Sequence, residues 1–180
     1  MQSRTAYHAR RFGVALAAAL ALIISTVTGA SAASLTWAGG ASGLWTSGSN
    51  WSNGAVPGTN DLVAINTSAI ITNVPNISLS RLYIGTGAIV SLRASAARTV
   101  TISNGAGVDF DVAPSAVFND DGTGSGALTI ALASGATGTV EGTINVTTAA
   151  HRILSATAGG LTFNTGSVIS LVVCHDWVDG

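Results

Sequence analysis

The feature that most constrains the fold of this chain is a series of short runs in which apolar and polar residues alternate. Beyond residue 32 no stretch carries apolar residues at helical spacing, and the runs are rich in Val, Ile and Thr. Alternation with a period of two buries one face of a strand, so the runs predict an all-β protein. The predicted strands are 62–65, 79–84, 88–92, 99–102, 108–112, 128–132, 139–140, 143–146, 161–163 and 168–173.

The turns between these runs bear on which all-β fold the chain adopts. A unit of turn residues, then Ala or Ser, then Val recurs in the segments 86–90, 104–108, 114–117, 134–140 and 165–168. The steps between units run near ten, twenty and thirty residues, as coils of about twenty residues would give in a solenoid. An antiparallel β-sandwich with regular hairpins gives a similar spacing and stays the alternative. Strands with few charges and many small residues favour a parallel β-solenoid, because its coils stack closely.

Three of the four tryptophans lie within fifteen residues, at Trp37, Trp45 and Trp51, among Gly, Ser and Ala. A solenoid exposes its core and its unpaired strand edges at each end. Each indole can bury on the order of 200 Å², so the three rings are predicted to cover the first coil. Pro57-Gly58 and Asp61 then turn the chain into its first long strand. The alternative is a flat platform on which the rings stack against sugars.

The succession of Trp37, Trp45, Asn50-Trp51, Pro57 and Asp61 before a Val/Ile strand resembles the opening of the passenger regions of large bacterial surface proteins. These are the autotransporter-type and haemagglutinin-like adhesins. The resemblance implies a right-handed parallel β-helix displayed outside the cell. That family is defined by architecture rather than by a catalytic set, so the resemblance implies no catalytic residue.

The N-terminal segment 1–32 has the pattern of a signal peptide. Basic residues precede an apolar run over 12–27, and Ala30-Ser31-Ala32 offers the small residues read by a signal peptidase. We expect cleavage near Ala32 and a secreted or cell-surface protein, with an uncleaved anchor helix as the alternative. The mature chain then divides into a Trp-rich cap (33–61), solenoid repeats (62–173) and an irregular tail (174–180). The tail is consistent with a truncated or frame-shifted reading, and a naturally short protein is the alternative.

The charge and cysteine content exclude several classes of partner. The chain has no lysine, and after cleavage four arginines face eight acidic residues, a net charge near −4. Such a surface offers no footprint for nucleic acid or for an anionic membrane surface, and we expect no membrane insertion of the mature chain. The single cysteine, Cys174, cannot form an internal disulfide, so packing and backbone pairing must stabilise the fold. We expect no cofactor.

Two acidic segments are the candidates for chemistry. Asp109 and Asp111 flank Phe110, so their carboxylates are predicted to share one face of a strand, as a glycoside hydrolase would require. A solvated outer face is the favoured interpretation of this pair. The polar turn over 119–126 has oxygen ligands suited to Ca²⁺ but lacks the acid spacing of known calcium loops, so a bare loop is favoured. His151 and His175 have no partner at metal-ligand spacing, and we expect no metal site.

These observations predict an exported, non-enzymatic structural or adhesion protein that presents a repetitive polar β-solenoid face. Its expected partner is an extracellular surface, a matrix or a glycan. One alternative is a carbohydrate-binding module in which Trp37, Trp45 and Trp51 stack on sugar rings. A polysaccharide-degrading β-helix enzyme is the third interpretation.

Overall fold

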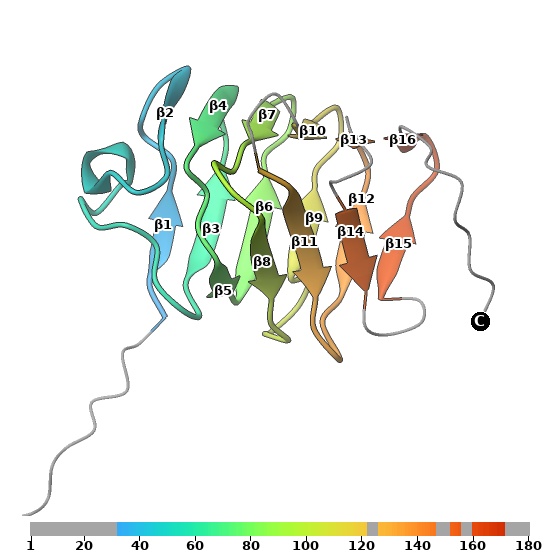
Figure 1. The fold of residues 1–180 in the computed structure, drawn as a ribbon. Helices are drawn as coiled ribbons and strands as arrows, with labels where there is room; N and C mark the ends of the chain where they lie inside the picture. Colours follow the sequence, from blue (N-terminus) through green and yellow to red (C-terminus); the bar gives the residue numbers. More distant parts are fainter. Residues whose placement is uncertain (1–31, 122–125, 147–151, 156–159, 172–180) are drawn as a thin grey trace, which may run out of the picture. The chain divides into compact units, whose positions relative to one another are not determined.

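A computed structural model describes residues 32–121, 126–146, 152–155 and 160–171. In these segments the chain is all-β apart from one short 3₁₀ turn, η1 (Gly48–Asn50), and its strands form three parallel sheets (Figure 1). The first sheet contains β1 (Ser34–Thr36), β3 (Leu62–Ile65), β6 (Arg81–Ile84), β9 (Phe110–Val112), β12 (Gly138–Val140) and β15 (Leu161–Phe163). The second sheet contains β2 (Ser42–Leu44), β4 (Ala69–Thr72), β7 (Ile89–Leu92), β10 (Val117–Asp120), β13 (Thr143–Val146) and β16 (Val168–Leu171). The third sheet contains β5 (Ile77–Leu79), β8 (Arg98–Ile102), β11 (Leu128–Leu132) and β14 (Arg152–Ser155).

The chain visits the three sheets in turn and so winds into a β-solenoid of about 5 turns. Each strand inside a sheet pairs in parallel with the strands one coil before and one coil after it; β6, for example, lies between β3 and β9. The predicted solenoid is therefore confirmed. The antiparallel sandwich is wrong, because among the described residues antiparallel pairing is limited to two isolated bridges.

The coils differ in length more than the sequence pattern suggested. Residues that pair across the first sheet lie 19 positions apart between β3 and β6 (62 to 81) and 28 apart between β6 and β9 (82 to 110). The step from β12 to β15 is 23 positions (138 to 161). The extra residues are accommodated in the corners, since the strands themselves keep three to five residues in every coil.

The core is formed by side chains that occupy the same position in successive coils. In the first sheet Leu35, Val63, Leu82 and Phe110 are in register and each is at most 1% exposed. Phe110 meets Phe118 of the second sheet edge to face, with ring centroids 5.8 Å apart. Such columns bury the inward-facing apolar side chains of the strands, and this burial is the main stabilising contribution to the fold.

Four of the five recurring sequence units, all except the one over 104–108, form the same corner of the solenoid. In the segments 85–88, 113–116, 133–136 and 164–167 the last residue donates its backbone N–H to the carbonyl of the first. The third residue of each turn has a positive φ, at Gly87, Ser115, Gly135 and Gly166. Glycine adopts this conformation at little cost, and the Ala or Ser that follows is small enough for the close approach of the next coil.

Candidate functional site

The three tryptophans of the N-terminal region form one buried cluster. The rings of Trp37, Trp45 and Trp51 are 4%, 0% and 2% exposed. Trp51 lies between the other two, with edge-to-face contacts at centroid distances of 5.2 Å to Trp37 and 4.9 Å to Trp45. Figure 1 shows the segment between β2 and β3, which contains Trp45, η1 and Trp51, beyond β1 at the end of the stack. The cluster covers the first coil and leaves no ring face open to a sugar.

Hydrogen bonds fix two of the three indoles. Trp37 Nε1 donates to the carbonyl of Gly40 at 2.9 Å, and Trp51 Nε1 donates to the carbonyl of Trp45 at 2.8 Å. The buried Nε1 of Trp45 has no hydrogen-bond partner. A Cβ atom on Gly43 would lie 3.1 Å from the Trp37 ring and 2.6 Å from the Asn50 amide, so a larger residue here would force the Asn50 side chain to move.

The segment that leaves the cluster is tied to the first strand. Asp61 accepts backbone hydrogen bonds from Ala33 and Gly58, both at 2.7 Å. Pro57 is buried beside this turn. Asp61 therefore holds the turn that leads into β3, as the sequence predicted, and each of its carboxylate oxygens accepts one backbone hydrogen bond.

The two acids around Phe110 have separate roles. Asp109 is 1% exposed, and its carboxylate accepts backbone hydrogen bonds from Gly105 and Thr137, both at 2.8 Å. Asp111 lies on the outer face of the first sheet and forms an ion pair with Arg81 at 3.1 Å. The prediction that both carboxylates share one solvated face is wrong, because Asp109 precedes β9 and turns inward to bridge two coils.

Asp111 belongs to a small outward cluster with Arg81 and Tyr83. The Arg81 guanidinium lies 5.1 Å from the centroid of the Tyr83 ring, within cation–π distance. Burial raises the pKa of the Asp111 carboxyl above its ordinary value; the hydrogen bond and the charge of Arg81 act in the opposite direction, and the charge of Glu141 adds to the rise. The Glu141 carboxylate in turn accepts a 2.9 Å hydrogen bond from the Asn164 amide.

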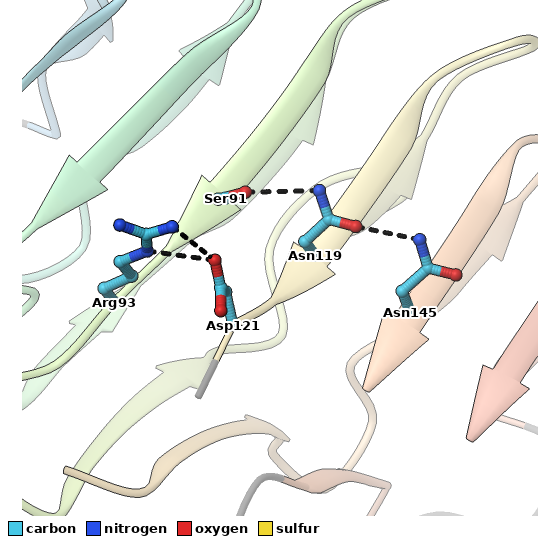
Figure 2. Close-up of polar contacts among 5 residues, drawn as sticks. All are labelled: Ser91, Arg93, Asn119, Asp121 and Asn145. Atoms are coloured by element: carbon cyan, nitrogen blue, oxygen red, sulfur yellow. Dashed lines mark hydrogen bonds and ion pairs between the residues drawn. The ribbon is translucent and has the colours of Figure 1, made fainter. Parts of the chain in front are cut away.

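The outer face of the second sheet carries a column of hydrogen-bonded side chains that runs across three coils (Figure 2). The Asn119 amide donates to Ser91 Oγ at 3.2 Å and accepts from the Asn145 amide at 2.8 Å. Ser91, Asn119 and Asn145 are paired residues of β7, β10 and β13, and Ser170 of β16 follows in the same register. We call these four residues the amide column.

On each of these four strands, a second outward-facing residue lies two positions before the member of the amide column. Ile89, Val117, Thr143 and Val168 are in register, and Ile89 and Val168 are 54% and 52% exposed. We call this set the aliphatic column. At the other side of the amide column, the Arg93 guanidinium holds the Asp121 carboxylate through Nε and an Nη atom at 2.9 and 2.7 Å, as Figure 2 shows.

The structure separates the acids of the predicted polar turn. Asp120 points inward in register with Leu92 and is 0% exposed, whereas Asp121 reaches Arg93 on the outside. The two carboxylates therefore do not converge on one point. In the described part of the chain no group of three or more His, Cys, Asp or Glu side chains could hold a metal ion.

Several predicted features lie outside the described residues. They are the signal segment 1–31, the turn residues 122–125, His151, and the tail with Cys174 and His175. Among the described residues, no helix has the length and apolar character needed to span a bilayer.

The sequence-based search for sites did not include the amide column. A signal was present, because Val117-Phe-Asn-Asp120 and Thr143-Ile-Asn-Val146 both place Asn third in a β run. Comparisons with protein-family models, curated proteins and solved structures find no match to this chain. Functional inference therefore depends on the geometry and chemistry of these residues.

Proposed function

We propose that the chain is an exported, non-enzymatic structural or adhesion protein that binds extended surfaces through the outer face of its second sheet. The pairing of the amide column with the aliphatic column is the observation that carries this proposal. From β7 to β16, each strand of the second sheet carries a Ser or Asn side chain in the amide column and an Ile, Val or Thr side chain in the aliphatic column. Neighbouring strands repeat this arrangement at a spacing of about 4.8 Å. Such a face suits a partner that is itself repetitive, such as a matrix polymer or a glycan.

The amide column can bind a partner without losing its own order. An asparagine side chain offers two N–H donors and two acceptor lone pairs, and the column uses only part of this capacity. Asn119 gives one N–H to Ser91 and accepts one from Asn145. The internal bonds hold the side chains in fixed rotamers, so less conformational entropy is lost when the remaining groups bind.

Affinity on such a face would come from many weak contacts. A repetitive ligand that engages several coils at once gains avidity without any single strong pocket. The amide column carries no charge at Ser91, Asn119 or Asn145, which favours a neutral partner. Export and display at the cell surface are part of the proposal, supported by the signal-like segment and by the resemblance to adhesin passenger regions.

The two alternatives have weaker geometric support. Trp37, Trp45 and Trp51 are at most 4% exposed. Carbohydrate binding by these residues would require their rings to move out of the core. Hydrolysis by Asp109 and Asp111 would require two convergent carboxylates, whereas Asp109 is held by backbone N–H groups and Asp111 by Arg81.

The proposal is tested by placing charge on this face. The chain, immobilised in many copies on beads, is assayed for retention on insoluble neutral polysaccharides and extracellular matrix. The double variant Thr143→Lys/Asn145→Lys alters both columns of the second sheet. The matched control Thr99→Lys/Thr101→Lys puts the same charges on the third sheet, where both threonines are also half-buried in the outer face of β8.

We expect the wild type and the control to be retained and the Thr143→Lys/Asn145→Lys variant to be lost, with unchanged circular dichroism in all three. Equal retention of the two variants would contradict the proposed face. Turnover of a polysaccharide, abolished by Asp111→Asn, would support the enzymatic alternative instead. The export component is checked separately, because N-terminal sequencing of the secreted form should begin at Ala33.

A further inference from the structure

The backbone nitrogen of Ala33 lies at the carboxylate of Asp61. It donates a 2.7 Å hydrogen bond to Asp61 Oδ1, while Asp61 Oδ2 accepts from Gly58 N, also at 2.7 Å. Ala33 is fixed by two further contacts, because its carbonyl accepts from Leu62 N at 2.8 Å and the residue packs against the core. Contacts within the solenoid therefore set the position of this nitrogen.

The negative charge of Asp61 has no cationic partner among the described residues. The ion pairs found there join Arg81 to Asp111 and Arg93 to Asp121. Both hydrogen bonds to Asp61 come from neutral peptide groups. An ammonium group at the position of the Ala33 nitrogen would add a Coulombic attraction to the hydrogen bond that is already present.

The predicted processing reaction creates such a group. Hydrolysis of the peptide bond between Ala32 and Ala33 consumes one water molecule: Ala32 leaves with a carboxylate, and the Ala33 nitrogen becomes an α-ammonium group. Ala32 is exposed and lies two residues before β1. A cut one bond earlier would leave the Ala33 nitrogen in a peptide group, and a cut one bond later would remove it.

We infer that removal of the signal segment after Ala32 creates an α-ammonium group that Asp61 binds, and that this ion pair strengthens the first coil of the mature protein. The inference rests on the export that is part of the proposed function, and it adds a consequence of processing for the stability of the fold. It does not involve the outer face of the second sheet.

The ion pair acts on the strand that leads into the tryptophan cluster. Strand β1 has three residues and is an outer strand of the first sheet, with β3 as its neighbour there. Its far end is held by Ser52, whose N–H donates to the Thr36 carbonyl at 2.9 Å and whose hydroxyl accepts from Thr36 N at 3.1 Å. Trp37 follows directly. A stronger anchor at Ala33 therefore holds the near end of the same strand.

The partial exposure of the site limits the expected gain. Ala33 and Asp61 are both half-buried, and solvent screens an ion pair at such a position more than a fully buried pair. We therefore expect a change of about threefold to fivefold in the equilibrium constant of unfolding, rather than a requirement of the ion pair for folding.

The experiment compares chains that differ by one residue at the N-terminus. Residues from Ala32 onward form one compact unit, so this part can be released from a fusion protein by a protease that leaves either Ala33 or Ala32 first. In the form that begins at Ala32, the α-ammonium group lies one residue away and the Ala33 nitrogen is again a peptide N–H. Each form is also made with Asp61→Asn. A further sample of the Ala33 form is acetylated at its α-amino group, which removes the charge without a substitution.

We expect urea titrations to give an equilibrium constant of unfolding about threefold to fivefold lower for the form that begins at Ala33 than for the form that begins at Ala32. Acetylation or Asp61→Asn should abolish this difference, while circular dichroism and tryptophan fluorescence of the native proteins stay the same. Equal stability of the two wild-type forms, or a difference that persists with Asp61→Asn, would overturn the inference.

N-terminal sequencing of the secreted form tests the shared premise separately. The absence of a secreted form would contradict the proposed export, whereas a secreted form that begins at a residue other than Ala33 would overturn the binding of the new N-terminus by Asp61.

Discussion

The indole Nε1 of Trp51 donates a 2.8 Å hydrogen bond to the carbonyl of Trp45, whose own ring lies against that of Trp51 at 4.9 Å. Trp51 thus contacts both the backbone carbonyl and the indole ring of Trp45. The pair joins the residue that follows β2 to the residue that follows η1, across the loop that closes the end of the solenoid.

The two indoles should respond differently to the same substitution. Trp51→Phe removes a hydrogen bond, whereas Trp45→Phe removes a buried N–H that has no partner. The two substitutions remove a similar apolar area, but only Trp51→Phe also removes a hydrogen bond. We therefore expect Trp51→Phe to be the more destabilising by about 1 kcal/mol. Urea unfolding of the two variants measures this difference, and equal free energies of unfolding would argue against the bond's contribution.

Close packing between coils predicts a severe effect at Gly142. A Cβ atom there would lie 2.7 Å from the Ala113 carbonyl oxygen and closer still to that of Ala116. Both are backbone atoms that cannot rotate away, so Gly142→Ala should lower the free energy of unfolding by about 2 kcal/mol. At Gly58 the nearest atom is 3.5 Å away, and Gly58→Ala should change stability by less than about 0.5 kcal/mol. Similar thermal midpoints for the two variants would contradict this packing.

The raised pKa of Asp111 predicts a pH dependence of stability. Burial favours the protonated form of this carboxyl more in the folded than in the unfolded chain, despite Arg81. Its contribution to stability is therefore fully present below its ordinary pKa of 3.8 and is lost as the pH rises through the folded-state value. As the pH increases through this value, the free energy of unfolding of the wild type should fall relative to that of Asp111→Asn. Denaturant titrations at a series of pH values measure this difference. A wild type that instead gains stability relative to the variant would mean that the ion pair with Arg81 dominates.

The sequence was sufficient to predict the class of fold but only part of its strands. Runs with clear alternation, such as those over 62–65, 128–132 and 143–146, correspond to strands with these bounds. The run over 79–84 is divided between β5 and β6, because a corner at Ser80 carries the chain from one sheet to the next. Strand β4 was missed because Ile70 is apolar and exposed, and β10 because Asp120 is polar and buried. Both residues violate the alternation on which the prediction depends.

The amide column could not be predicted from the pattern alone. Ser91, Asn119 and Asn145 lie 28 and 26 positions apart, and the coil lengths that align them are set by the corners rather than by the strands. The buried cluster of three tryptophans, in contrast, was predictable, because three large apolar rings beside the first strand have no other place to be buried.

Fluorescence of the cap tests the central claim, that these tryptophans seal the end of a solenoid. In a Trp177→Phe background, Trp37, Trp45 and Trp51 are the remaining indoles of the chain. The structure predicts blue-shifted emission that resists acrylamide quenching and does not change when soluble glycans are added. Red-shifted, readily quenched emission that responds to a glycan would contradict it and would make the three rings a binding platform.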